Sequence, residues 1–226
     1  DPHWIDTIDL YRSGNLEVRP NVTPEAKKLI ESLEPDTELR KILEYRIPEL
    51  IDYQNFNYAK EYFDFVSEVF SREKEVRMSS ELSQNVAKYL FKLMATKDEY
   101  EVARLSLKAE LDTAIELEFG RSAKFNYMLH PPFLKALENI PLINKLPGVK
   151  SKLSLGPWFK VFYVMLKNMK FIRGTYFDFM AIFSRDVRVA DRKALKHYKE
   201  TILNNLDSIN NGEYEKLIKF SKLPDL

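Results

Sequence analysis

Apolar side chains recur at three- and four-residue steps along most of the chain, the spacing that places them on one face of an α-helix. A strong stripe of this kind runs from Asn55 to Phe70 and has a charged opposite face. A second, from Leu82 to Met94, is broad enough to predict a nearly buried helix. A third follows Asp98, which can cap it, and continues as one long helix to Ile115. These stripes predict a mainly α-helical fold, a bundle-like arrangement of several helices.

Further helices are expected before and after these stripes. Thr23 can cap a helix that begins at Pro24, and another begins near Thr37. After Gly156-Pro157 comes a helix whose apolar seam we expect in the core: Trp158, Phe162, Met165, Leu166 and Met169. Two more are expected near residues 189–207 and 213–222. The chain thus has enough amphipathic helices to bury a common core.

Residues 123–155 depart from helical spacing. Lys124–Leu129 alternates like a strand and Lys152–Leu155 is a plausible partner, which predicts a two-stranded β excursion with a short helix, 133–138, between the strands. The charged run 71–77 predicts a solvated connection. We expect one domain over 1–226, with sub-layers 1–77 and 78–226 as a finer division within it.

Composition narrows the functional classes. The 226 residues are 45% hydrophobic, enough for a core, and the formal net charge of +1 argues against nucleic-acid or membrane-surface binding. There is no cysteine, which excludes disulfides, cysteine-ligated metal centres and thiol catalysis within the chain. No apolar run approaches eighteen residues, and we expect a cytoplasmic location. The chain begins at Asp1, which suggests a piece of a longer product.

Some charged residues fall on apolar stripes, in an aromatic-rich connection near 171–188, or at a helix start. These residues are the candidates for a functional site. A buried guanidinium is costly unless a carboxylate or phosphate pairs with it. Internal ion pairs, with Asp98, Glu99, Asp178 and Asp191 as acceptors, are the first interpretation, and a pocket for a carboxylate, a phosphate or coenzyme A is the second. The candidates are Arg46, Lys97, Asp98, Glu99, Arg104, Arg173, Asp178, Arg188, Asp191 and Arg192.

No catalytic or metal-binding set is recognisable. The three histidines, His3, His130 and His197, are scattered without metal-ligand spacing, and His130 before two prolines is more simply a loop histidine than an acid or base. The isolated glycines form neither a dinucleotide fingerprint nor a P-loop, and no nucleophile elbow is present. We therefore predict no catalytic residue, no metal site and no cofactor within this chain.

Several motifs resemble one known family. The run 89–105, YLFKLMATKDEYEVARL, is similar to a signature in the helical C-terminal region of the indolepyruvate:ferredoxin oxidoreductases, which belong to the 2-oxoacid:acceptor oxidoreductases. Four further segments resemble other motifs of the family and follow one another in the same order. They are Tyr45-Arg46-Ile47 with 52–59, then 128–132, then 155–158, and then Arg173-Gly174-Thr175 with Asp178. The sequence departs from the family at 179–181, where Phe-Met-Ala replaces Pro-Phe-Gly, and at Val187-Arg188, where Glu-Arg is common.

The resemblance implies a role inside a larger enzyme. Such enzymes decarboxylate an arylpyruvate oxidatively to its acyl-CoA, with thiamine diphosphate and iron–sulfur clusters, and reduce ferredoxin. The chain is then expected to be an accessory, non-catalytic helical domain that packs on the catalytic modules through segments such as the arm near Trp4 and Tyr11 and the 171–183 loop. Two alternatives stay open. One is a module that binds coenzyme A or the substrate anion through Arg104, Arg173 and Arg188, and the other is an independent helical interaction domain or small enzyme.

Overall fold

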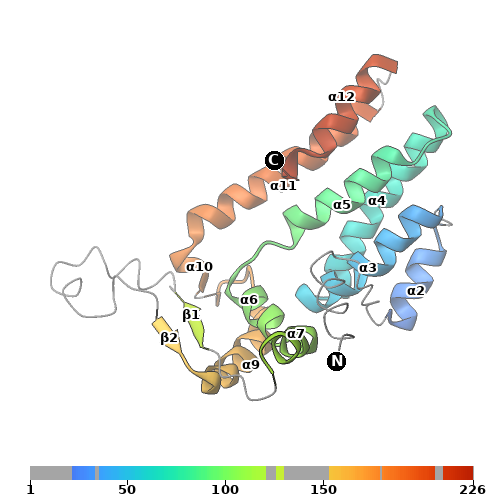
Figure 1. The fold of residues 1–226 in the computed structure, drawn as a ribbon. Coiled ribbons are helices and arrows are strands. Elements are labelled where there is room, and N and C mark those ends of the chain that lie inside the picture. Colours follow the sequence, from blue (N-terminus) through green and yellow to red (C-terminus); the bar gives the residue numbers. More distant parts are fainter. Residues whose placement is uncertain are drawn as a thin grey trace. The chain divides into compact units, whose positions relative to one another are not determined.

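The computed structural model describes residues 22–33, 36–120, 126–129, 153–178, 180–206 and 211–225. The fold is mainly α-helical, as the apolar stripes predict (Figure 1). The helices are α2 (Pro24–Glu31), α3 (Thr37–Tyr53), α4 (Phe56–Val76), α5 (Glu81–Met94), α6 (Glu99–Ser106), α7 (Ala109–Phe119), α9 (Lys160–Asn168), α10 (Met180–Phe183), α11 (Arg185–Leu206) and α12 (Asn211–Ser221). Three 3-10 turns, η1 (Pro157–Phe159), η2 (Met169–Ile172) and η3 (Leu223–Asp225), accompany them.

The β excursion is confirmed. Strand β1 (Tyr127–Leu129) pairs antiparallel with β2 (Leu153–Leu155) in a two-stranded sheet. Tyr127 lies opposite Leu155, and Leu129 opposite Leu153. The short helix expected at 133–138 and the arm at residues 1–21 lie outside the described residues.

The chain divides into two compact units. Unit 1 contains residues 97–185, and unit 2 contains 22–96 together with 186–225. The division expected from the charged run was after residue 77 instead. That point lies between α4 and α5, which pack against each other within unit 2.

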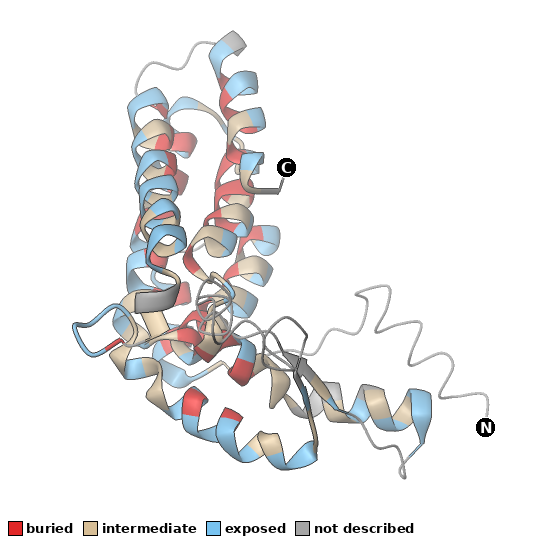
Figure 2. Cartoon of the chain, turned by 90° about the vertical axis from the view of Figure 1, so that its left-hand side faces the viewer, coloured by how far each residue is buried: buried red, intermediate tan, exposed pale blue. Residues whose placement is uncertain are grey.

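The helices of unit 2 pack around one apolar core. Its core side chains come from α2, α3, α4, α5, α11 and α12, and most are fully buried on the inner helix faces (Figure 2). Tyr58 and Tyr62 of α4 donate hydrogen bonds to the carbonyls of Met94 and Ala87 in α5, so both hydroxyls are satisfied. Asp36 and Asn55 accept hydrogen bonds at the starts of α3 and α4, as capping residues do.

Unit 1 has a smaller core between α6 and α9. Tyr100 and Ala103 of α6 pack with Tyr163 and Leu166 of α9, all of them nearly or fully buried. Aromatic rings extend this core toward the ribbon, because the Tyr127 ring contacts Tyr163 edge-on at 4.9 Å between centroids. The α6 and α9 segments are far apart in sequence, so this core depends on tertiary folding.

Three predictions about these elements are wrong. The run 71–77 is not a solvated connection, because α4 continues to Val76 and Glu73 is 1% exposed. The helix after Asp98 is not continuous, because it ends at Ser106 and α7 begins at Ala109. Trp158 and Met165 are not core residues, since they are 67% and 47% exposed.

The boundaries near the C-terminus are close to those expected. Helix α11 begins at Arg185, four residues before the expected start, and α10 forms within the aromatic-rich connection. Helix α12 matches the last expected helix closely. None of the described helices combines the length and the hydrophobicity that crossing a membrane requires.

Candidate functional site

The Asp98 carboxylate at the start of α6 makes two kinds of contact. Asp98 accepts a hydrogen bond from the Glu101 backbone N–H at 2.9 Å and thereby caps α6. The same carboxylate binds the Arg173 guanidinium through two bonds, Nε to Oδ2 at 2.6 Å and Nη2 to Oδ1 at 2.8 Å. The two side chains are only 8% and 9% exposed. This bidentate pair therefore fastens the 173–178 turn to the start of α6.

A second buried carboxylate, Asp178, holds the other end of that turn. Its Oδ1 accepts a hydrogen bond from the Tyr100 hydroxyl at 2.9 Å, and its Oδ2 accepts one from the Gly174 N–H at 2.8 Å. The Ala181 N–H also reaches Oδ1 at 3.2 Å, at the start of α10. Gly174 has φ 74°, a left-handed conformation that suits glycine and is strained for most other residues. The left-handed backbone conformation at Gly174 thus accompanies the hydrogen bond from its N–H to Asp178.

The third pair lies within α6 itself. Arg104 donates from Nε and Nη2 to the two carboxylate oxygens of Glu101, both at 2.8 Å. Both side chains are almost completely buried, at 7% and 6% exposure. Glu101 was not among the predicted acceptors, although its separation of three residues from Arg104 places the two on neighbouring positions of one helix face.

Together these residues form one polar network inside unit 1, which we call the α6 network: Asp98, Tyr100, Glu101, Arg104, Arg173 and Asp178. The Tyr100 ring joins its parts, because the Arg173 guanidinium lies 5.5 Å from the ring centroid while the hydroxyl binds Asp178. Each of the two guanidinium groups already has a carboxylate, since Arg104 pairs with Glu101 and Arg173 with Asp98. An additional anion would meet carboxylates there rather than uncommitted arginines.

The six remaining candidates are Lys97, Glu99, Arg46, Arg188, Asp191 and Arg192. Lys97 is exposed and Glu99 partly buried, both beside the network in sequence. Arg46 on α3 stacks on aromatic rings, 4.3 Å from the Phe91 centroid and 5.2 Å from that of Tyr45. The last three candidates, Arg188, Asp191 and Arg192, are on α11 in unit 2. Arg188 and Asp191 are partly buried, and Arg192 is exposed. The structure thus brings together Asp98, Arg104, Arg173 and Asp178.

A buried carboxylate that sequence reasoning missed lies in unit 2. Glu73 of α4 accepts hydrogen bonds from the backbone N–H groups of Leu82 at 2.9 Å and Ser83 at 2.8 Å, in the first turn of α5. The Ser83 hydroxyl also donates to it, as does the Tyr214 hydroxyl at 2.5 Å. Glu73 therefore caps a neighbouring helix across space, where the helix dipole favours a negative charge.

A signal for Glu73 was present in the sequence. It lies three, four and seven residues after Phe70, Val69 and Val66, so it extends the buried stripe of α4 by one turn. Its partner Tyr214 is likewise 3% exposed. Burial and the hydrogen bond to Glu73 raise the pKa of Tyr214 to about 12. No sequence pattern connects these two residues, which are 141 positions apart.

Comparison with known families gives one match, over residues 39–226, to the family described as "Family of unknown function (DUF6537)". The chain belongs to this family. Comparison with curated proteins and with solved structures gave no match.

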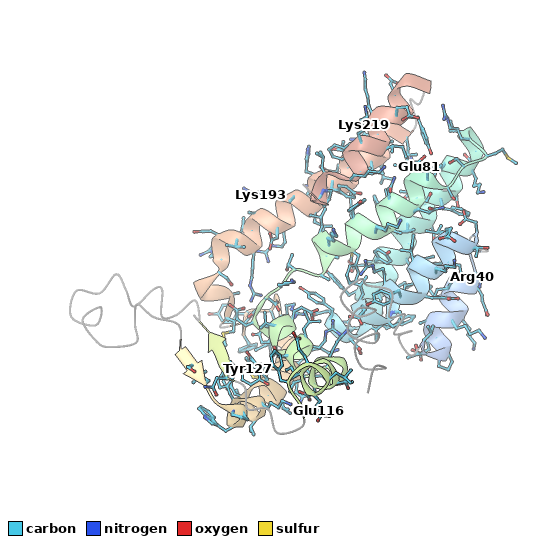
Figure 3. The ribbon with its side chains drawn as sticks, in the orientation of Figure 1. Arg40, Glu81, Glu116, Tyr127, Lys193 and Lys219 are labelled. Carbon is cyan, nitrogen blue, oxygen red and sulfur yellow. The ribbon has the colours of Figure 1, made fainter. Side chains whose placement is uncertain are left out.

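The DUF6537 match includes every residue of the α6 network and also Glu73 with its partners Leu82, Ser83 and Tyr214. Within the described part of the chain, no three histidine or carboxylate side chains gather as metal ligands would. The charged surface is spread over separate helices, with Lys193 on α11 and Lys219 on α12 both exposed (Figure 3). The buried polar clusters are therefore the features that a functional interpretation of this DUF6537 chain must explain.

Proposed function

We propose that this chain is an accessory helical domain, without catalytic residues of its own, of an enzyme resembling the indolepyruvate:ferredoxin oxidoreductases. In this proposal it packs on the catalytic modules and steadies their contacts. The parent enzyme would decarboxylate an arylpyruvate or a related 2-oxoacid. Thiamine diphosphate, the iron–sulfur clusters and the contact with ferredoxin would belong to those modules, and the location would be cytoplasmic.

One observation carries the proposal. Two of the stretches that resemble the family, residues 89–105 and 173–178, supply all the residues of the α6 network. Asp98, Tyr100, Glu101 and Arg104 come from the first stretch, and Arg173 and Asp178 from the second. In a structural domain, charged residues of this kind hold one segment of the chain against another. This arrangement supports a scaffold rather than a reaction centre.

The pairing also weighs against the anion-binding alternative. Arg104 and Arg173 each use two nitrogen donors on a buried carboxylate. A coenzyme A phosphate or a substrate carboxylate would have to displace that carboxylate and leave it buried without its cation, which is strongly unfavourable. An exposed lysine such as Lys97 remains, but a single flexible ammonium group gives little specificity.

The first test is association. The chain is mixed with the separately purified thiamine-diphosphate-binding and electron-transfer modules of the proposed parent enzyme. Complex formation is measured by sedimentation velocity. We expect a stoichiometric complex that contains both. If the chain sediments alone at every concentration up to tens of micromolar, the scaffold proposal is wrong.

The second test separates the scaffold from the anion-binding module. Thermal unfolding of the chain is followed with and without saturating coenzyme A, thiamine diphosphate or indolepyruvate. We expect no shift, whereas a ligand present at a hundred times its dissociation constant would stabilise the native chain by about 2.7 kcal/mol. A shift that disappears in the Lys97→Ala variant but persists in Lys193→Ala would favour the binding module. Lys193 is also an exposed lysine, lies in unit 2 and serves as the matched control.

A further inference from the structure

Helix α9 carries apolar side chains on two opposite sides, and other described residues cover only one of them. Tyr163 and Leu166 are 3% and 4% exposed and pack on α6. At 100° per residue, Val161 and Met165 point to the opposite side of the helix. A surface helix normally has its apolar side chains in one stripe that faces the core. The open side of α9 is therefore a surface without a partner among the described residues.

This open side is wide enough to form a patch, which we call the α9 surface. It consists of Trp158, Val161, Phe162, Val164, Met165 and Phe171, from η1, α9 and η2. Trp158, Val161 and Phe171 are 67%, 77% and 71% exposed. Scattered apolar residues are normal on protein surfaces, but a contiguous group of large ones marks an interaction site. Tryptophan, phenylalanine and methionine are also residue types enriched in protein interfaces.

Charge indicates what covers this surface. From Leu153 to Phe177 the chain has basic residues, Lys160, Lys167, Lys170 and Arg173, and no acidic one. Lys160 and Lys167 are seven residues apart and lie on one flank of α9, between its buried and its open side. Lys160 pairs with Asp112 of α7 at 2.8 Å, whereas Lys167 is exposed to solvent. Arg173 is paired with Asp98 and its side chain is only 9% exposed, so Lys167 is the exposed cation at the edge of the apolar α9 surface.

We infer that the α9 surface docks on a protein partner whose contact face is apolar at its centre and carries carboxylates at its rim. This inference rests on the proposed function, and the partner is one of the catalytic modules of the parent enzyme. A second copy of the chain fits less well, because residues 153–177 of that copy contain no carboxylate that could face Lys167. A membrane fits less well because α9 is only nine residues long, about 14 Å, with a fold packed behind it.

The first experiment measures the affinity of the chain for the purified catalytic modules by titration calorimetry. The variants Val161→Glu and Met165→Glu place a carboxylate on the open side without disturbing the contact with α6. We expect each to weaken binding at least tenfold. The matched control is Met78→Glu in unit 2, where the native side chain is 98% exposed, and we expect it to bind like the wild type.

Charge is tested separately. We expect Lys167→Glu to weaken binding several-fold at low salt and to reduce its dependence on ionic strength, because it opposes the acidic rim. Lys219→Glu makes the same change on α12 and should have no effect. If Lys167→Glu and Lys219→Glu bind equally well at every salt concentration, the acidic-rimmed partner is wrong.

A footprint gives an independent reading. Because the chain has no cysteine, a Val161→Cys variant has one thiol, whose reaction with a maleimide reports whether the α9 surface is open. We expect rapid labelling of the chain alone and strong protection when the catalytic modules are added, with no protection of a Met78→Cys variant. Slow labelling of the chain alone would mean that part of the chain itself covers the surface, which overturns the inference.

The outcomes distinguish this inference from the proposed function. If the modules bind the wild type and the α9 variants equally, the inference is wrong and the accessory role stands. If the modules do not bind the wild type, both fail. Sedimentation of the chain alone as a dimer that Val161→Glu dissociates would assign the surface to a second copy. Binding to vesicles of phosphatidylserine and phosphatidylcholine that Val161→Glu abolishes would assign it to a membrane, and either result overturns the inference.

Discussion

Tyr214 of α12 donates a hydrogen bond to Glu73 of α4, with 2.5 Å between its hydroxyl oxygen and Oε1. Both side chains are buried, and Glu73 also caps the first turn of α5. One carboxylate thus connects three helices of unit 2, two of which are adjacent in sequence and one of which comes from the end of the chain.

Removal of the Tyr214 hydroxyl should destabilise unit 2. In Tyr214→Phe the ring still fills its place, but Glu73 loses one donor to a buried charge, and hydrogen bonds of this kind contribute about 1.5–3 kcal/mol. We expect the free energy of unfolding in urea to fall by about 2 kcal/mol. Tyr176→Phe removes the hydroxyl of a 98% exposed tyrosine and should change stability by less than about 0.5 kcal/mol. Equal effects of the two variants would contradict a stabilising role for the bond.

The same pair predicts a loss of stability at alkaline pH. The pKa of Tyr214 is raised to about 12 in the folded chain, against about 10 for an ordinary tyrosine. The folded state therefore holds this proton more tightly, so its contribution to stability is complete below pH 10 and is lost as the pH rises from 10 toward 12. Between pH 9 and 11 we expect the wild type to lose about 1 kcal/mol more than Tyr214→Phe.

Urea titrations of both proteins at each pH measure that difference. Other buried tyrosines, such as Tyr62 and Tyr198, also have pKa values raised by burial, but they are present in both proteins and cancel. Parallel pH profiles for the two proteins would show that Tyr214 is not the group responsible.

Breaking the buried pair between Asp98 and Arg173 should be severe. Arg173→Gln leaves the Asp98 carboxylate buried without its cation, which costs about 3–5 kcal/mol for pairs of this kind. Asp98→Asn with Arg173→Gln removes both charges, and we expect the double variant to regain part of the loss. The midpoint and slope of denaturant unfolding, followed by fluorescence, measure each change.

A surface pair provides the control. Lys60 and Asp64 on α4 lie 2.6 Å apart but are 49% and 54% exposed, so Lys60→Ala should cost less than about 0.5 kcal/mol. If Arg173→Gln proves equally mild, the α6 network does not hold unit 1 together.

The turn at Gly174 should accept asparagine better than valine. Its φ of 74° is unfavourable for residues with a side chain, and a Cβ there meets no atom within 4 Å, so the cost of substitution is conformational rather than steric. We expect Gly174→Val to destabilise the chain by about 2 kcal/mol and Gly174→Asn by about half as much, because asparagine tolerates this region. Thermal unfolding of both variants gives the comparison, and equal losses would contradict a backbone origin.

The candidate site was only partly foreseeable from sequence. Arg104 and Asp98 were identifiable because one falls on a helix stripe and the other at a helix start. Glu101 as the partner of Arg104 was also within reach, since the two are three residues apart on one helix. The pairing of Asp98 with Arg173, 75 residues away, had no local signal. Whether the outer face of α9 is buried could not be predicted either, because an apolar stripe does not reveal how many neighbours a helix has.

The sequence by itself predicted most of the helices, the small ribbon and the local caps Thr23 and Asp98, since these depend on apolar periodicity and on groups within four residues of each other. Tertiary structure alone decided which carboxylate meets which donor. It placed Glu73 against α5 and Tyr214, joined Asp98 to Arg173, and left the α9 surface uncovered by the other residues that the structure describes. The physical reason is that such contacts join segments distant along the chain, so they form only when the packing of whole helices brings those segments together.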